Sequence, residues 1–291
     1  MAGWASPLAW WRTVAGTGIS APDTPYPPGR AAAVPAPGRR WLLAASLLLL
    51  AGVLLVNSRL LRPREQVLDD FDRPDGLVTN EFAHWNPASP NAVRSPVWDV
   101  TSGSLFAQGG VGWTGRPDAT APTPASTSAT NSAVFRVVTH RGDFRNCTLS
   151  LSLHVRRFVH TPLTPPRPWD GVTIFLRYQS EELLYAVSVS RRDGSVVIKK
   201  KVPGGDVNGG TYYTLAEDTK PSPAGDWRRV RISINDRSDG TVVIRLRQRG
   251  RQLVARDTGI GDTAPINSAG RIGLRGDNAD FEFDDVTVSR A

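Results

Sequence analysis

Hydrophobic and polar residues alternate with a period of two along most of the chain after residue 67. The clearest case is CTLSLSLHV, residues 147–155, where the odd-numbered positions are apolar and the even-numbered ones polar. A strand with one buried face has this pattern. Further strands are predicted at 97–100, 104–107, 133–139, 171–178, 184–190, 194–200, 211–215, 230–235, 242–249, 252–255 and 270–274.

Short turn motifs separate these segments, at Arg-Asp-Gly (192–194), Ser-Asp-Gly (238–240) and Gly-Asp-Asn (276–278). Such residues favour tight reversals of the chain, and no convincing amphipathic helix follows residue 60. About a dozen short strands therefore predict an all-β fold, a two-sheet antiparallel jelly-roll sandwich spanning residues 67–291. Two long interruptions, residues 114–132 and 160–171, are predicted to be surface loops.

The last segment, ADFEFDDVTVS, changes phase in its middle. Phe281 and Phe283 share one parity, whereas Val286 and Val288 share the other. A β-bulge at Asp284–Asp285 would bring all four into the core. The Arg-Gly-Asp triplet just before it, which also occurs at 141–143, is then part of the turn into the final strand rather than an adhesion signal.

Residues 41–58 form the most apolar segment of the chain. Eighteen uncharged residues lie between Arg40 and Arg59, about 27 Å of helix at 1.5 Å per residue, which nearly matches a bilayer core. We expect an uncleaved signal anchor that inserts in the lipid bilayer; a cleaved signal and a twin-arginine signal at Arg39–Arg40 are the alternatives. Residues 1–40, rich in Pro and Ala, are expected to be a disordered cytoplasmic tail, and 59–66 a linker.

The charge of +8 is concentrated in that tail. Residues 1–64 hold seven arginines and one acid, whereas the rest holds 28 basic and 26 acidic residues. A nearly neutral folded part argues against nucleic acid as a partner. The single cysteine, Cys147, excludes an intrachain disulfide and a cysteine zinc site. The excess of Arg over Lys is typical of a GC-rich bacterial genome, so the expected location is the bacterial cell membrane, with the sandwich outside the cytoplasm.

Four stretches resemble the concanavalin A-like lectin/glucanase superfamily, in its laminin G-like and 3-keto-disaccharide-hydrolase-like branch. They are VLDDFDRPDG (67–76), WDVTSGSLFAQ (98–108), the Trp-led hairpin and strand at 226–257, and GRIGLRGDNADFEFDDVTVS (270–289). The resemblance covers residues 66–291. It implies a sandwich whose concave sheet and rim loops bind saccharides, and pairing of the first and last strands that brings Phe71 close to Phe281 and Phe283.

Catalytic members of that superfamily differ from this chain in their carboxylates. Laminarinase-type enzymes carry an E-x-D-x-x-E strand, which supplies the two carboxylates of hydrolysis. The nearest match here, Glu282-Phe283-Asp284, has Thr287 in place of the third acid. We therefore expect a non-catalytic carbohydrate-binding domain for an envelope or extracellular polysaccharide. A glycoside hydrolase or polysaccharide lyase on the same scaffold, and a structural or protein-interaction module of the envelope, are the alternatives.

Aromatic and planar polar residues are the natural partners of sugar rings and hydroxyls. Such residues gather on neighbouring predicted β elements, and the candidate saccharide-binding residues are Trp169, Asp170, Arg177, Tyr178, Tyr185, Arg191, Tyr212 and Tyr213. Any one of them could instead fill the core. A Ca²⁺ ion could bind where the terminal strands meet, at Asp70, Asp72 and Asp285.

Basic residues also recur on predicted strand faces. Lys199–Lys201, Arg229, Arg231, Arg245, Arg247 and Arg249 are expected to project from outer faces. They could meet an anionic polysaccharide, or form an ordinary solvated surface.

Overall fold

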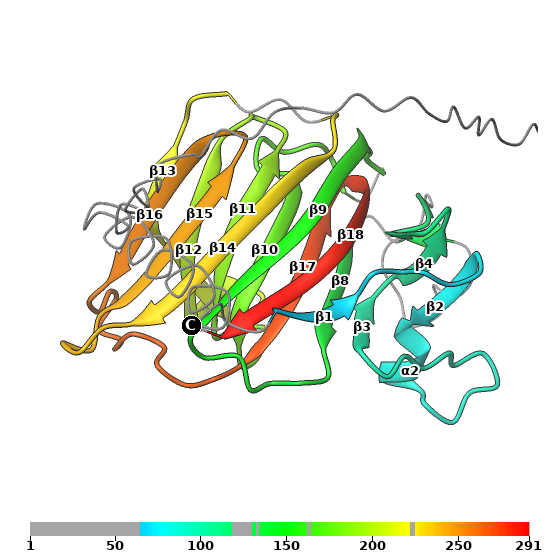
Figure 1. Cartoon of the computed structure of the whole chain (residues 1–291), viewed down its shortest axis with the longest axis horizontal. Helices are drawn as coiled ribbons and strands as arrows, with labels where there is room; N and C mark the ends of the chain where they lie inside the picture. Colours follow the sequence, from blue (N-terminus) through cyan, green and yellow to red (C-terminus); the bar gives the residue numbers. More distant parts are fainter. Residues whose placement is uncertain (1–64, 118–129, 132–133, 162–163, 222–224, 291) are drawn as a thin grey trace, which may run out of the picture. The chain divides into compact units, whose positions relative to one another are not determined.

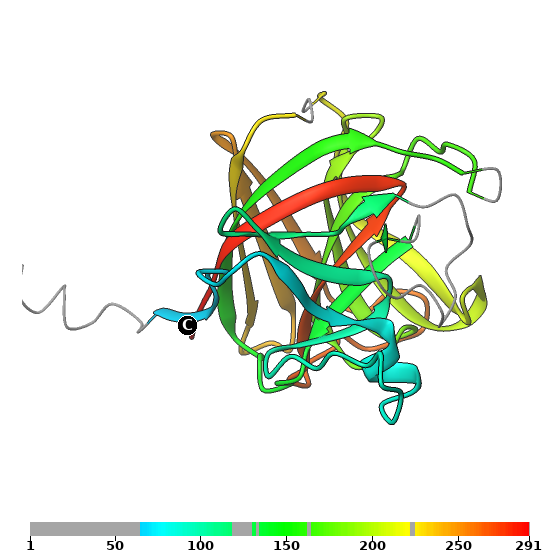
Figure 2. The same cartoon turned by 90° about the vertical axis from the view of Figure 1, so that its right-hand side faces the viewer.

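The computed structural model describes residues 65–117, 130–131, 134–161, 164–221 and 225–290. They form the expected all-β sandwich of two antiparallel sheets, which Figure 1 shows face-on and Figure 2 edge-on. The predicted membrane segment 41–58 and the tail before it lie outside these residues. Within the described ranges no helix is long and apolar enough to span a membrane.

The first sheet has nine strands. Their order is β16-β15-β14-β9-β18-β5-β4-β2, with β1 added beside β18. Their bounds are β1 Glu65–Asp69, β2 Gly76–Asn80, β4 Ser104–Gln108, β5 Val111–Trp113, β9 Cys147–Phe158, β14 Arg228–Asp236, β15 Val242–Gln248, β16 Arg251–Asp257 and β18 Ala279–Arg290.

The second sheet has seven strands in the order β13-β12-β11-β10-β17-β8-β3. Their bounds are β3 Trp98–Ser102, β8 Val134–Thr139, β10 Gly171–Tyr178, β11 Leu184–Arg191, β12 Val196–Val207, β13 Gly210–Asp218 and β17 Arg271–Asp277. All its pairs are antiparallel. A one-turn helix, α2 (Glu81–Trp85), and a short parallel pair, β6 (Arg116–Pro117) with β7 (Thr130–Asn131), complete the elements.

The core lies between the two sheets, where the alternation of the strands places one apolar face of each. Leu149, Leu151 and Leu153 of β9 are at most 1% exposed, as the period of two predicts. The predicted strands are confirmed, with shifts of one or two residues at most ends. β12 extends further than predicted, to Val207; after Lys201 it pairs with β13 and no longer with β11, in a hairpin whose turn holds Asn208 at φ 46°.

The last strand closes the sandwich as expected. β18 pairs with β9 and with β1, so the first and last strands lie together. Phe71 and Phe283 meet edge to face, with ring centroids 5.1 Å apart. The register of β18 slips between Asp284 and Thr287, where Asp285 has φ 51°. This bulge is the device that buries Phe281, Phe283, Val286 and Val288 together.

Asp69 gives the opening stretch DDFD (69–72) a structural role in this chain. Its buried carboxylate accepts hydrogen bonds from the indole of Trp98 (2.7 Å) and the amide of Phe71 (3.0 Å), and pairs with Arg73. A buried charge is stable only when it is paired and hydrogen-bonded. This carboxylate therefore fixes β1 against β3 in the second sheet and orients Phe71 into the core.

Candidate functional site

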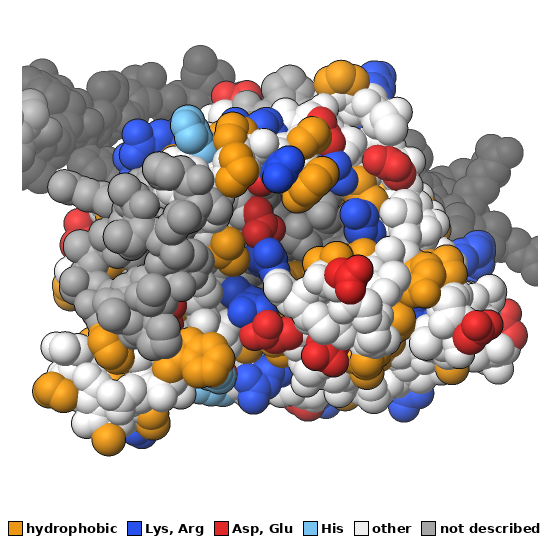
Figure 3. All heavy atoms as spheres, turned by 180° about the vertical axis from the view of Figure 1, so that it is seen from behind, with side chains coloured by type: hydrophobic (Ala, Val, Ile, Leu, Met, Phe, Trp, Pro, Cys, Tyr) orange, Lys and Arg blue, Asp and Glu red, His pale blue; other side chains and the backbone are white. Residues whose placement is uncertain are grey.

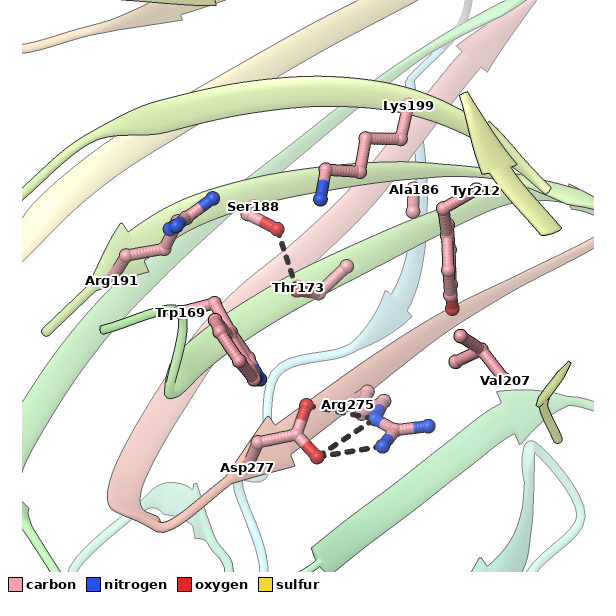
Figure 4. A pocket seen from close by; sticks show the side chains of 10 residues that line it. All are labelled: Trp169, Thr173, Ala186, Ser188, Arg191, Lys199, Val207, Tyr212, Arg275 and Asp277. Carbon is pink, nitrogen blue, oxygen red and sulfur yellow. Dashed lines mark hydrogen bonds and ion pairs between the residues drawn. The ribbon is translucent and has the colours of Figure 1, made fainter. Parts of the chain in front are cut away.

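A groove of about 330 Å³ lies on the outer face of the second sheet. Figure 3 looks onto this side of the molecule, where charged and hydrophobic side chains surround a hollow, and Figure 4 shows the groove from close by. The volume falls within the usual range of small-molecule sites, roughly 300–1,000 Å³. Its lining residues are Trp169, Thr173, Ala186, Ser188, Arg191, Lys199, Val207, Tyr212, Arg275 and Asp277.

The groove continues an apolar cluster on the same outer face. This cluster is separate from the core between the sheets, and Tyr212 packs against it. Its five buried members are Val138, Phe175, Tyr178, Leu184 and Ala186. Phe175 and Tyr178 stack with centroids 5.7 Å apart. Apolar residues at outward-facing positions of a sheet are unusual unless something covers them, so this face differs from an ordinary solvated strand surface.

Two aromatic side chains stand on opposite sides of the groove (Figure 4). Trp169 is 58% exposed and lies in the loop before β10, where the guanidinium of Arg167 sits over its ring. The loop is held by the buried carboxylate of Asp170, which accepts hydrogen bonds from the Arg167 amide (2.8 Å) and the Asn278 side chain (3.0 Å). Asp170 thus positions Trp169 without lining the groove itself.

Tyr212 of β13 forms the other side. The ammonium groups of Lys199 and Lys201 lie 5.8 Å and 5.2 Å from its ring centroid, within the range of cation–π attraction. Burial raises the pKa of the Tyr212 hydroxyl, so it is a neutral hydrogen-bonding group at ordinary pH.

Polar side chains occupy the bed of the groove between the aromatic residues. The hydroxyls of Thr173 and Ser188, partners across β10 and β11, lie 2.9 Å apart. Arg275 donates to both carboxylate oxygens of Asp277, two residues along β17, at 2.7–3.0 Å. Arg191 pairs in the same way with Asp193, at 2.6 Å and 3.1 Å. The arrangement offers hydroxyls, guanidinium groups and a carboxylate between two aromatic surfaces.

Lys199 is the third cation of the groove and points into it from β12 (Figure 4). Its side chain is partly buried, and this burial, together with the nearby positive charge of Arg191, lowers its pKa. No carboxylate of the described residues lies within ion-pair distance of its ammonium.

The structure brings three of the eight candidate residues, Trp169, Arg191 and Tyr212, into the groove. Tyr178 lies on the same outer face in the adjoining apolar cluster. Tyr213 points in the opposite direction from its neighbour Tyr212. It packs so closely against Gly261 that a Cβ added to this glycine would lie 2.3 Å from the Tyr213 ring. It therefore lies outside the groove.

Arg177 lies inside the sandwich because of a bulge in β10. The register with β17 slips between Phe175 and Tyr178, and Arg177 has φ 47°. The slip turns Tyr178 outward and Arg177 inward, where its fully buried guanidinium pairs with Asp236 (2.7 Å) and donates to the carbonyl of Ile266 (2.6 Å). Its contacts are those of a structural residue.

Tyr185 also points into the core. Its hydroxyl donates to Asp257 (2.6 Å) and accepts from the amide of Ile266 (3.0 Å). Asp257 is paired with Lys200 at 3.2 Å, and both side chains are fully buried. The expectation that all three lysines of 199–201 project outward is therefore wrong for Lys200, because consecutive strand residues face opposite sides.

Lys199 is among the basic residues that the sequence predicts to face outward, but the remaining groove residues were not predicted from the sequence. Arg275 and Asp277 belong to the Arg-Gly-Asp triplet, which the sequence predicts to be part of a turn. Thr173, Ala186 and Ser188 are small residues at outward positions of predicted strands. Their parity, opposite to Val172, Ile174, Val187 and Val189, was the available signal. Val207 gave none, because its position depends on the length of the β12–β13 hairpin.

The carboxylates of two of the three aspartates expected to bind calcium, Asp285 and Asp70, accept hydrogen bonds from the protein. Asp285 accepts hydrogen bonds from Arg229 (2.9 Å) and Ser152 (3.2 Å), and Asp70 accepts one from the amide of Asp72 (3.3 Å). Across the described part of the chain, no group of three or more His, Cys, Asp or Glu side chains is arranged to hold a metal ion.

No protein-family model matches the chain, and no curated protein sequence does. Solved structures of similar fold include the carbohydrate-binding module CBM66 from Bacillus subtilis (14% identity, TM-score 0.45, covering 66% of this chain and 94% of that chain). Others are a protein of unknown function with a galectin-like fold from Bacillus subtilis (11%, 0.46, 66% and 89%) and an endo-1,3-beta-glucanase from Streptomyces sioyaensis (14%, 0.45, 77% and 95%).

At these identities the similarity concerns the arrangement of strands alone, and both binding modules and enzymes share it. The two-sheet jelly-roll fold is the one that the resemblance to concanavalin A-like proteins implied.

Proposed function

We propose that the groove on the outer face of the second sheet binds a saccharide and that the domain acts by binding rather than by catalysis. The observation that carries the proposal is the pair of aromatic side chains, Trp169 and Tyr212, on opposite sides of a bed of hydroxyl and charged groups. Aromatic faces pack against the apolar faces of sugar rings, and planar polar groups bind their hydroxyls.

The polar groups of the groove suit this role because they are already held in place. The pairing of Arg275 with Asp277 and of Arg191 with Asp193 fixes both guanidinium groups before a ligand arrives. Groups ordered in advance lose little conformational entropy on binding. Arg275 retains an unused edge for hydroxyl oxygens, since Nη1 takes no part in its pair with Asp277.

The number of carboxylates in the groove supports binding without hydrolysis. Glycoside hydrolysis requires two carboxyl groups on either side of the scissile bond. Among the described residues that line the groove, Asp277 is the single carboxylate, and Arg275 holds it as an ion pair. A hydrolase or lyase reaction is tested alongside binding, by following reducing ends and unsaturated uronate absorbance.

The test is a glycan array probed with the full-length chain, followed by titration of any saccharide that binds. Trp169→Ala should weaken binding about tenfold, as for a central aromatic contact. Trp227→Ala is the matched control, because Trp227 is also exposed (46%) but lies before β14, in the other sheet. Silence across the array would contradict the proposal and favour a protein-interaction role.

We propose in addition that residues 41–58 anchor the chain in a bacterial membrane, with the sandwich outside the cytoplasm. Eighteen uncharged residues flanked by arginines support this. A reporter fused at residue 66 should be cleaved by protease added to intact cells. Protection of the reporter until the cells are lysed would contradict this topology.

A further inference from the structure

We infer that the saccharide of the groove is acidic, and that Lys199 binds its carboxylate or sulfate group. The inference rests on the proposed function and goes further, because it names the class of sugar.

Three arginines on the strands of this part of the sheet each have a carboxylate partner. Arg275 is paired with Asp277 (2.7 Å), Arg191 with Asp193 (2.6 Å), and Arg136, which is opposite Arg275 on β8, with Glu181 (2.7 Å). Three positive charges are thus neutralised within the protein itself. Their pairing leaves Lys199 as the cation without a partner among the lining residues.

Lys201 shows what the same side chain does when it has a structural role. It lies two residues further along β12, and its ammonium donates to the carbonyls of Glu181 (2.7 Å) and Asn208 (3.3 Å). The ammonium of Lys200 also has structural partners, the carbonyls of Thr263 and Ala264 and the carboxylate of Asp257. Lys199 alone of the three reaches no oxygen of the described residues and points into open space (Figure 4).

The position of Lys199 disfavours its charge in the free protein. Burial removes water from the ammonium, and Arg191 adds a second positive charge nearby; both lower its pKa. The carboxylates of Glu217 and Asp193 oppose this only from a distance. An unpaired, partly desolvated ammonium destabilises the folded protein, and the Lys199 ammonium makes no structural contact that would compensate for this cost. An anion bound beside it removes that cost.

The surroundings point to a sugar acid rather than a small inorganic anion. Ala186 and Tyr212 flank the Lys199 side chain, and Trp169 and Val207 complete an apolar border. A lone phosphate or sulfate ion would leave these surfaces exposed. A sugar ring covers them and presents an exocyclic carboxylate or a sulfate ester to the ammonium.

The test is a panel of matched pairs, titrated against the full-length chain. Galacturonan oligosaccharides are compared with the same oligosaccharides after methyl esterification, alginate oligosaccharides with their carboxyl-reduced form, and sulfated galactans with desulfated ones. The carboxylate and sulfate arms distinguish the two sources of charge. Binding of an acidic member should exceed that of its neutral form by about tenfold or more, the usual range for a charge-assisted hydrogen bond.

Substitutions then assign the preference to Lys199. Lys199→Met should abolish the difference between acidic and neutral members, and Lys199→Arg should restore most of it. Lys220→Met, which removes the same charge from an exposed position after β13, is the control and should change nothing. The thermal midpoint of each variant is measured, because loss of folding would lower binding to all members equally.

The two proposals fail in different ways. Equal binding of acidic and neutral members, or an acidic preference that survives in Lys199→Met, would overturn the inference and leave saccharide binding intact. Absence of binding throughout the panel and the array would overturn both.

Discussion

The ammonium of Lys199 in β12 lies 5.8 Å from the ring centroid of Tyr212 in β13. These two strands form a hairpin, in which Val196 pairs with Asp218 at one end and Pro203 with Gly210 at the other. The contact offsets part of the cost of a partly buried charge but does not remove it. The remaining cost gives the first prediction, which concerns stability rather than binding.

Lys199→Met should leave the domain at least as stable as the wild type near neutral pH. The pKa of Lys199 is lowered in the folded state, mainly by burial, so the unfolded chain binds the proton more tightly. The penalty for its charge is present below the folded pKa and disappears as the pH rises toward the ordinary value of 10.5. The difference in thermal midpoint between variant and wild type should therefore shrink between neutral pH and about 10.5. A variant that is clearly less stable at neutral pH would contradict this.

Tyr185→Phe should lower stability without affecting saccharide binding. The substitution removes a hydroxyl that donates to Asp257 and accepts from the amide of Ile266, both buried. Leaving such groups without a partner costs about 1–3 kcal/mol of unfolding free energy. Denaturant unfolding measures the loss, and titration with a saccharide measures binding. Weaker binding at unchanged stability would place Tyr185 in the ligand site instead.

Asp285→Val should destabilise the closing strand. Asp285 adopts φ 51° at the bulge, a conformation that a β-branched residue adopts at a cost of about 1–3 kcal/mol. Asp285→Gly is the matched control, since it also removes the exposed pair with Arg229 but tolerates positive φ. The free energy of unfolding, measured by denaturant titration, should fall for the valine variant and stay within about 1 kcal/mol of the wild type for the glycine variant. Equal losses would show that the side chain, not the bulge, matters.

Asp170→Asn should weaken saccharide binding less than Trp169→Ala does. Asp170 does not line the groove, but its carboxylate accepts from the Arg167 amide and the Asn278 side chain and so holds the loop that carries Trp169. An amide retains one acceptor oxygen and loses the ionic contact with Arg192. Titration of both variants should give a graded loss, with Trp169→Ala the larger. A larger loss for Asp170→Asn would assign this residue a direct contact with the sugar.

The strands could be predicted from the sequence because a half-buried strand leaves a period of two in the chain, as in residues 147–155. The bulge in β18 could also be predicted, because Phe281 and Val286 are apolar residues of opposite parity that both have to be buried. The bulge in β10 could not. Arg177 and Tyr178 are both plausible on either face, and only the packed structure shows which one turns inward.

The groove was predictable in part for a similar reason. An aromatic residue in a Pro-rich loop, such as Trp169, is conspicuous in the sequence. Lys199 is not conspicuous, because it is one of three consecutive lysines. The three have different surroundings in the structure, and nothing in the sequence distinguishes them. Pairing across strands, which brings Thr173 beside both Ser188 and Arg275, depends on the sheet order and leaves no local pattern.

Hydrogen exchange of the full-length chain, with and without a saccharide selected from the array, tests the central claim most directly. If the groove is the binding site, the ligand should slow amide exchange around Trp169, in β10 and β11, at the β12–β13 hairpin and near Arg275, and leave β14–β16 unchanged. Protection confined to β14–β16 or to the outer face of β9 would contradict the account and place the ligand on the other sheet.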